Sequence, residues 1–266
     1  MRDHGLEDRV QGALDDGSSV WVVGDIHGYC ETFEALLGRL NLSDGDMVVC
    51  LGDLIDRGPD SLGVLRMVRD RPEVSSIRGN HDEMLRLSLS PKHGRMMKSW
   101  MKYGGQQTLQ SMSGDEAERL EEARGWVGFV ESLPTQLVLR DFRLAHAGYV
   151  EGKELDTQSN QDPMWSRGIF EQSTPLDEER QILVGHTTTQ FLMGDDSDGI
   201  WESPVLLPDG RPSVIGIDTG IYHPPGKNPR LTAVNLADGT LIAQQRIEDS
   251  YVEITPLRQM VVRDSS

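Results

Sequence analysis

Short apolar runs that lead into a glycine recur along the 266-residue chain. Each run has the length and the β-branched content of a buried strand, and the glycine that follows permits a tight turn. We expect six buried strands from this pattern: Val20–Val23, Met47–Leu51, Val74–Ile77, Phe142–Ala145, Ile182–Val184 and Val214–Ile217.

Two amphipathic segments lie between the first three runs. Residues Glu31–Leu40 and Ser61–Arg69 repeat their apolar side chains at helical spacing. The chain therefore begins as βαβαβ, which is typical of an α/β fold. In such folds ligands bind beyond the carboxyl ends of the strands, so we expect the functional residues to lie there.

The rest of the chain has a different character. Residues 83–133 are polar with helical periodicity, which predicts a helical subdomain beside the sheet and a candidate lid. Residues 187–213 are rich in Gly, Asp, Ser and Pro, which indicates a loop that carries a hairpin. Residues 250–266 are expected to form a partly mobile tail. No repeat or low-complexity tract divides the sequence, so we expect a single domain over residues 1–266.

The composition limits the classes of partner. The formal net charge is −17, which argues against a stable nucleic-acid complex and against binding to an anionic membrane. Local arginines and metal ions can still make one cleft attractive to phosphate. No apolar run approaches the roughly 20 residues that a membrane helix needs. Cys30 and Cys50 lack metal-finger spacing. We expect a monomeric cytoplasmic enzyme.

The residues after the first two runs match the needs of a metal site. Asp25 and His27 are two positions apart, so on an extended segment both side chains point to one side and can chelate one ion. Asp53 follows the neighbouring run, and its two carboxylate oxygens can hold two cations at once. These three residues therefore predict one half of a dinuclear site.

Neutral ligands for a second ion follow the later runs. Asn80, His146 and His186 each come after an apolar run, and uncharged ligands limit the negative charge of the site. Alone, a histidine at such a place is more often an ordinary hydrogen-bonded residue. Taken together, these residues favour metal binding instead, because five predicted strand ends each supply a residue that can bind metal next to glycine. Bound ions would lower the pKa of water toward neutrality.

The remaining histidines differ in their expected roles. His81 is adjacent to a predicted ligand, so it lies near the metals without needing to bind one. If Asp56 accepts a hydrogen bond from one ring nitrogen, the other nitrogen can protonate a leaving alkoxide. His4 and His93 are expected to lie in polar loops and to be solvated. His223 belongs either to the loop surface or to the rim of the site.

Three arginines are candidates for binding phosphate. Arg57 follows the bridging carboxylate by four residues, Arg78 precedes a predicted ligand by two, and Arg167 lies in a later loop. The planar guanidinium matches phosphate oxygens, so three such groups around two metals would clamp a phosphoryl-transfer transition state. For each arginine alone, a surface salt bridge is the ordinary interpretation.

Taken in order, these motifs resemble those of the phosphoprotein-phosphatase (PPP) family of metallophosphoesterases. The family patterns GDxHG, GDxxDRG, GNH(E/D), HAG and GH correspond to Gly24–Gly28, Gly52–Gly58, Gly79–Asp82, His146–Gly148 and Gly185–His186. The resemblance extends over about residues 20–236. It is closest to small bacterial and phage-type members, which share the segments Trp165–Arg167 and Asp218–Gly220 and a final strand at Leu231–Leu236.

The resemblance implies an α/β (α+β) fold, a four-layer αββα calcineurin-like sandwich of two mixed sheets with a helical insert. It assigns one ion to Asp25, His27 and Asp53, and the other to Asp53, Asn80, His146 and His186. It gives the acid role to His81 with Asp56, and phosphate binding to Arg57, Arg78 and Arg167. It implies two divalent ions, with Mn²⁺ as the first choice and Fe, Zn or Mg as alternatives, and direct attack of a metal-bound hydroxide.

Two activities compete within the resemblance. Serine/threonine protein phosphatases act on phosphorylated proteins or peptides, and symmetrical diadenosine-tetraphosphate hydrolases cleave dinucleotides; another small phosphoester is a third substrate class. The dinucleotide hydrolases typically have Ala in place of Asp56, which favours the phosphatases, because a His–Asp pair matters most for an alkoxide leaving group. Asp82 weakly favours the hydrolases, or reflects only a helix-start preference. An inactive scaffold that binds phosphorylated partners is disfavoured, because no ligand, acid or clamp residue is missing.

Overall fold

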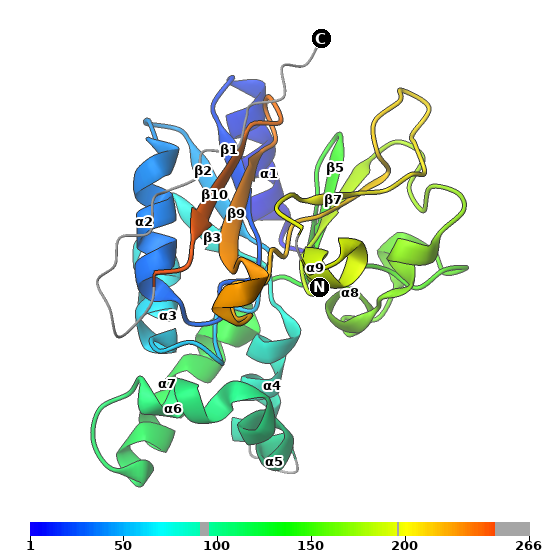
Figure 1. Cartoon of the computed structure of the whole chain (residues 1–266). Coiled ribbons are helices and arrows are strands. Elements are labelled where there is room, and N and C mark those ends of the chain that lie inside the picture. Colours follow the sequence, from blue (N-terminus) through cyan, green and yellow to red (C-terminus); the bar gives the residue numbers. More distant parts are fainter. Residues whose placement is uncertain (91–95, 196, 248–266) are drawn as a thin grey trace.

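The computed structural model describes residues 1–90, 96–195 and 197–247, and its strands form two five-stranded sheets (Figure 1). All six predicted runs are strands, with ends that differ from the expectation by one residue at most. The predicted tail at residues 250–266 and His93 lie outside the described residues.

The first sheet has the strand order β10-β9-β1-β2-β3. Its three neighbouring strands β1, β2 and β3 are parallel, whereas β9 is antiparallel to β1 and β10 is antiparallel to β9. The strands are β1 (Val20–Val23), β2 (Met47–Cys50), β3 (Val74–Ser76), β9 (Arg230–Asn235) and β10 (Leu241–Gln245). The sequence did not predict β10, which lies at the edge of the sheet.

The second sheet has the strand order β4-β5-β6-β8-β7. Here β5, β6 and β8 are parallel, and the antiparallel strands β4 and β7 form the two edges. The strands are β4 (Gln136–Val138), β5 (Phe142–Ala145), β6 (Gln181–Val184), β7 (Trp201–Glu202) and β8 (Val214–Gly216). Both sheets are therefore mixed, as the sequence predicted.

Alternation along β1 shows how the layers are held together. Trp21 and Val23 face α2 (Cys30–Leu40) and α3 (Ser61–Asp70), with which they share one apolar core. Val20 and Val22 point the other way, into a second core between the two sheets. Because side chains alternate across a strand, one short apolar run serves both layers.

A third, smaller core covers the other face of the second sheet. It gathers Tyr149, Ile169 and Val184, and the short elements α8 (Asp162–Trp165), η4 (Gly168–Glu171) and α9 (Thr189–Met193) lie in the same part of the chain. The order of layers is helix, sheet, sheet, helix, which agrees with the predicted four-layer sandwich. The layer over the second sheet is thin, because it consists of short helices and loops (Figure 1).

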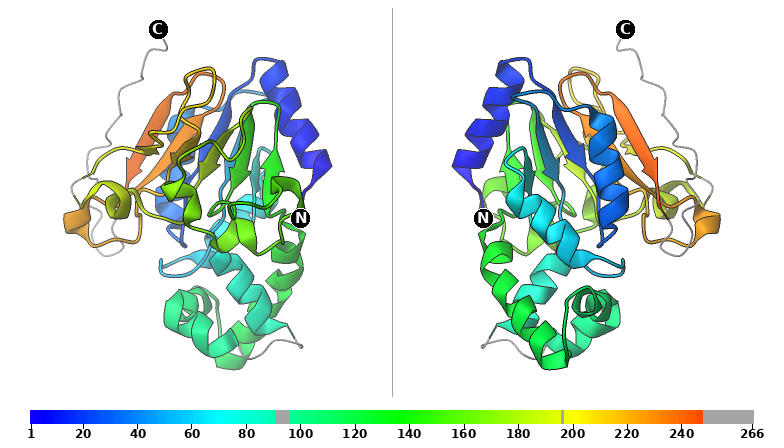
Figure 2. Two further views of the ribbon diagram at one scale, coloured as in Figure 1. Left: turned by 90° about the vertical axis from the view of Figure 1, so that its right-hand side faces the viewer. Right: turned by 90° about the vertical axis from the view of Figure 1, so that its left-hand side faces the viewer.

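An unpredicted helix, α1 (His4–Asp15), packs at the edge of the sandwich (Figure 2). Asp3 caps it by accepting a hydrogen bond from the backbone N–H of Leu6 at 3.0 Å. Leu6 and Val10 are buried in the core between the sheets. His4 begins this helix instead of lying in a loop, but its side chain is largely exposed, as expected.

The polar segment after β3 is helical and extends below the sandwich in Figures 1 and 2. It contains α4 (Asn80–Leu89), α5 (Met97–Trp100), the π-helical turn η2 (Met101–Gly105), α6 (Gln106–Gln110) and α7 (Glu116–Ser132). Its first helix begins at Asn80, three residues before the predicted start. Among the helices that the structure describes, none has the length and apolar character needed to cross a bilayer.

Candidate metal centre and active site

The loops that follow five strands meet at one end of the sandwich. Parallel strands present their carboxyl ends at the same edge of a sheet, so residues far apart in sequence come together there. The side chains that follow these strands are Asp25 and His27 (after β1), Asp53 (after β2), Asn80 and His81 (after β3), His146 (after β5) and His186 (after β6). The structure thus gathers all six residues predicted to bind metal.

The backbone of this cluster is strained. Within the described residues, seven non-glycine residues have positive φ, and five of them belong to the predicted site: His27, Asp53, Asp56, Arg57 and His186. Left-handed backbone is costly for such residues and persists only where the surroundings enforce it. Close packing provides that enforcement, because a side chain at Gly79 would collide with the carboxylate of Asp53, and one at Gly185 with that of Asp25.

The two carboxylate oxygens of Asp53 face different histidines. Oδ2 lies 3.5 Å from Nε2 of His27, and Oδ1 lies 3.4 Å from Nε2 of His146. Asp53 is 2% exposed, so its charge is removed from bulk water. This geometry is what a carboxylate shared by two cations requires.

Both of these histidines turn Nε2 toward Asp53. Nδ1 of His27 lies 3.0 Å from the carbonyl of Ile55, and Nδ1 of His146 lies 2.8 Å from the carbonyl of Leu51. A carbonyl can only accept, so Nδ1 carries the proton in each ring. Burial lowers the pKa of both rings, which keeps them neutral and able to bind a metal.

Asn80 lies between His146 and His186. Its Oδ1 lies 2.9 Å from Nε2 of His146 and 2.8 Å from Nδ1 of His186. Burial, and then the neighbouring His146, lower the pKa of His186 to about 2. Three neutral donors therefore converge on one side of Asp53, as expected for a second cation.

Buried negative charge accumulates on the opposite side. Asp25 is 2% exposed and accepts hydrogen bonds from the backbone N–H of His186 at 3.0 and 3.2 Å. Burial and the neighbouring carboxylates of Asp218 and Asp53 raise its pKa well above the ordinary value. Oδ2 of Asp218 is also buried, and no described residue donates to it. Carboxylates crowded in this way fit a site that cations neutralise.

The acid pair predicted from the sequence is present. Nδ1 of His81 lies 2.7 Å from Oδ2 of Asp56, and both side chains are buried. Because Asp56 accepts a hydrogen bond from Nδ1, Nε2 of His81 faces the cluster of predicted metal ligands. There it lies 2.9 Å from Nη2 of Arg57.

Arg57 lies between the acid pair and the metal ligands. Its Nη1 is 2.7 Å from Nε2 of His27, and its guanidinium carbon lies 3.9 Å from the ring centre of Tyr222. The ring stacks against the planar cation and fixes it beside the cluster. The lone pair on Nε2 of His27 cannot bind a metal ion and accept from Arg57 at the same time. An ion bound to His27 would therefore free Nη1 of Arg57 for another acceptor.

An open cleft of about 500 Å³ adjoins this centre. Arg167 is exposed there and lines the cleft together with His186. His223 also lines the cleft, so it belongs to the rim, one of the two alternatives left open by the sequence. Phe191 and Lys227 lie along the same cleft.

Arg78 does not join the phosphate-binding arginines, which corrects the expectation from the sequence. Its guanidinium is buried, with Nη1 3.0 Å from Oε2 of Glu83 and Nη2 2.6 and 2.9 Å from the carbonyls of Glu131 and Leu133. These bonds tie the end of α7 to the start of α4. The spacing of two residues from Asn80 was misleading, because α4 begins at Asn80 and the two residues therefore do not lie on one extended segment.

Asp82 also has a structural role. Its Oδ1 accepts from the backbone N–H of Leu54 at 3.1 Å, and its Oδ2 accepts from that of Gly79 at 2.8 Å. The carboxylate therefore caps the start of α4 and links it to the loop after β2. This role agrees with the helix-start preference, one of the two interpretations of Asp82 that the sequence offered.

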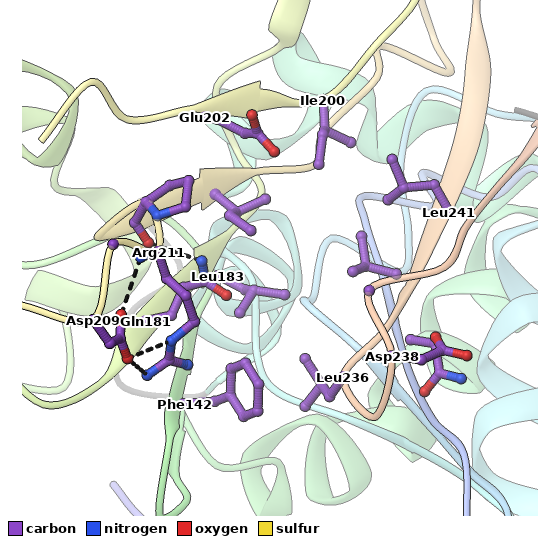
Figure 3. A pocket seen from close by; sticks show the side chains of 16 residues that line it. Phe142, Gln181, Leu183, Ile200, Glu202, Asp209, Arg211, Leu236, Asp238 and Leu241 are labelled. Atoms are coloured by element: carbon purple, nitrogen blue, oxygen red, sulfur yellow. Dashed lines mark hydrogen bonds and ion pairs between the residues drawn. The ribbon is translucent and has the colours of Figure 1, made fainter. Parts of the chain in front are cut away.

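A second cavity, of about 550 Å³, lies away from this cluster. It is bordered by Phe142 and Gln181, the first residues of β5 and β6, and by the hairpin that joins β9 to β10. Figure 3 shows apolar side chains around it and the ion pair of Arg211 and Asp209 at its border. The predicted ligands follow the last residues of β5 and β6, so this cavity lies at the opposite, amino-terminal ends of these strands.

Two mixed sheets that bring three histidines, two carboxylates and an amide to one end define the class of metallophosphoesterases. The chain belongs to the calcineurin-like phosphoesterase family, whose model matches residues 18–215. Members of this family are hydrolases that use divalent metal ions, and the structure supplies candidate ligands for them.

Similar proteins carry two different names. Serine/threonine-protein phosphatase 1 of Salmonella typhimurium is 42% identical over 90 residues, which are 32% of this chain and 38% of that protein. The symmetrical bis(5'-nucleosyl)-tetraphosphatase of Aromatoleum aromaticum is 28% identical over 137 residues, which are 50% of this chain and 45% of that protein. In both cases the matched segment spans less than half of the relative.

A solved structure supports the fold. A candidate diadenosine tetraphosphatase superposes with a TM-score of 0.59 at 23% identity, over 86% of this chain and 93% of that one. At this identity the similarity concerns the fold alone.

Proposed function

We propose that this protein is a dinuclear metal-dependent phosphomonoesterase that acts on phosphorylated serine or threonine side chains. One divalent ion would be held by Asp25, His27 and Asp53, and the other by Asp53, Asn80, His146 and His186. When bound, the ions lower the pKa of a coordinated water and neutralise phosphate charge. Mixed oxygen and imidazole donors suit Mn²⁺, Fe or Zn better than Mg²⁺.

Arg57 and Arg167 bind the phosphate in this proposal. Arg57 is stacked on Tyr222 and flanked by His27 and His81, so its cation is oriented before substrate arrives. Arg167 lines the open cleft, where its side chain can bind the phosphate of a substrate that enters. A pre-oriented guanidinium stabilises the charge that develops on phosphoryl oxygens.

His81 protonates the leaving oxygen. The hydrogen bond from Nδ1 to Asp56 fixes the orientation of the ring. Nε2 accepts from Arg57, and it can carry a proton to the leaving oxygen once a bound phosphate takes its place as the acceptor for Arg57. An alkoxide such as that of serine leaves poorly without a proton, whereas a phosphate anion leaves without much help. The His81–Asp56 pair is therefore the single observation that carries the choice of a phosphomonoester.

Dinucleotide hydrolysis is the second candidate. It is favoured by the similarity to the symmetrical bis(5'-nucleosyl)-tetraphosphatase, which covers half of this chain. The shared GNHD motif adds nothing to it, because Asp82 caps α4.

The test is a comparison of rates on two substrates with Mn²⁺ present. Purified protein is assayed with a phosphoserine peptide and with diadenosine tetraphosphate, each with a chelator control and with the His81→Asn variant. We expect a large preference for the peptide that disappears in the variant. A large preference for the dinucleotide would overturn the proposed substrate class.

A further inference from the structure

The helical segment after β3 reaches into the active site at the carboxylate of Asp56. Trp100, at the end of α5, is fully buried, and its indole N–H points at Asp56, with Nε1 2.9 Å from Oδ1 and 3.1 Å from Oδ2. Thr108 in α6 is also fully buried, and its hydroxyl donates to Oδ1 at 2.6 Å. With His81 on Oδ2, three donors from separate elements converge on one carboxylate.

The same threonine closes a small hydrogen-bonded ring around Asp56. The backbone N–H of Asp56 donates to the hydroxyl oxygen of Thr108 at 3.0 Å and to that of Ser61 at 3.0 Å. The Thr108 hydroxyl accepts from this N–H and donates to Oδ1, so both the backbone and the side-chain torsions of Asp56 are fixed. The ring therefore holds the carboxylate of Asp56 in one orientation.

The glycines of the turn η2 allow this close approach. Gly104 has a φ of +123°, and a side chain there would lie 2.6 Å from the backbone nitrogen of Arg57. A side chain at Gly105 would lie 2.5 Å from the ring of Trp100. The Tyr103-Gly104-Gly105 break therefore lets the helical segment pack directly on the loop that carries Asp56 and Arg57.

We propose that Trp100 and Thr108 are positioning residues for the leaving-group acid, and that the helical segment is a structural part of the catalytic machinery. They hold the Asp56 carboxylate in one orientation. The Nδ1–H of His81 can then donate to this carboxylate while Nε2 points at the leaving oxygen. Neither residue touches substrate. This inference rests on the proposed function, because it concerns the acid that a phosphomonoester needs.

Variants of Thr108 test the inference with the least disturbance. Thr108→Val keeps the shape and removes the hydroxyl, and Thr108→Ser is the matched control that keeps it. Each is assayed with Mn²⁺ on phenyl phosphate, which has a poor leaving group, and on p-nitrophenyl phosphate, which has a good one. Melting temperature and metal content are measured for each variant.

A loss of proton donation affects the two substrates unequally. A general acid contributes about 10²–10⁴-fold, so its partial misorientation in Thr108→Val should cost about tenfold in kcat on phenyl phosphate and far less on p-nitrophenyl phosphate. The KM of Thr108→Val should change little, and Thr108→Ser should keep the rate of the wild type. We expect the same inequality for Trp100→Phe. Equal losses on both substrates in Thr108→Val, or no loss on either, would overturn the inference.

A second readout does not depend on the substrate class. The His81 Nδ1 proton, identified by its absence in His81→Asn, can be followed as a downfield signal in proton NMR spectra of the protein. It should shift or broaden in Thr108→Val and remain in Thr108→Ser. An unchanged signal in Thr108→Val contradicts the inference even if the wild-type protein prefers dinucleotides, whereas that preference alone contradicts only the proposed function.

Discussion

His81 donates its Nδ1 proton to Asp56 across 2.7 Å, and both side chains are shielded from solvent. Because a carboxylate can only accept, Nδ1 carries a proton and Nε2 is left as the atom that can act on a substrate.

Replacement of this histidine should separate chemistry from metal binding. We expect His81→Asn to bind two ions as the wild type does and to lose about 10²–10⁴-fold in kcat on a phosphoserine peptide, the range for a lost general acid. Metal content by mass spectrometry and steady-state kinetics check the two parts. An unchanged rate would remove His81 from the acid role.

Asp53→Asn should weaken metal binding as well as slow the reaction. An amide has one oxygen acceptor instead of two equivalent anionic oxygens, so it cannot be shared by two cations in the same way. We expect fewer than two ions per chain after dialysis, with Asp44→Asn, on an exposed loop, as the matched control. Full metal content in Asp53→Asn would argue against a shared carboxylate.

Arg78 should prove to be a structural residue. Replacement by Met removes the ion pair with Glu83 and the hydrogen bonds to the carbonyls of Glu131 and Leu133, whereas Arg86 still pairs with Glu83. Buried acceptors left without a donor should lower the free energy of unfolding by about 1–3 kcal/mol. We expect a lower melting temperature with an unchanged KM at temperatures where the variant is folded. A raised KM at normal stability would return Arg78 to the phosphate site.

Asp218 should make a contribution to the stability of the metal-free protein that falls as the pH rises toward neutrality. Burial raises the pKa of Asp218 to about 6, above the unfolded value of 3.8. Between these two values the folded chain holds a proton that the unfolded chain has lost, so the free energy of unfolding decreases with pH in this window.

Melting curves with a chelator check this dependence. We expect the melting temperature of the wild type to fall between pH of about 4 and about 6 relative to that of Asp218→Asn, which lacks the titrating group. Excess Mn²⁺ should diminish the difference, because a bound cation favours ionised carboxylates. A wild-type melting temperature that rises relative to the variant would contradict the expected sign.

The residues of the cluster could be predicted because their signals are local. Each lies directly after a short apolar run, and the rule that parallel strands end at one edge of a sheet converts six separate positions into one cluster. The strands β1, β2, β3, β5, β6 and β8 followed from the same runs.

Elements with weaker local signals were missed. Strands β4, β7 and β10 lie at sheet edges, have two to five residues and depend on a partner strand for their conformation. Helix α1 is held by its contact with the inter-sheet core, through Leu6 and Val10, and this contact does not show in the sequence.

Roles that depend on tertiary contacts could not be read from spacing. Arg78 stands beside Asn80 in the sequence, yet its guanidinium reaches α7, some fifty residues later. Trp100 and Thr108 were noticeable only as part of a helical segment, because their partner Asp56 lies on another loop. The buried carboxylate of Asp218 was visible only as a turn residue.

The most direct test of the account is the position of the metal ions. Crystals of the protein soaked in Mn²⁺ should give two anomalous difference peaks per chain, about 3.5–4 Å apart, one on each side of the Asp53 carboxylate. The ligands should be the six residues named above. A single peak, or two peaks away from Asp53, would contradict the dinuclear centre on which the proposed function depends.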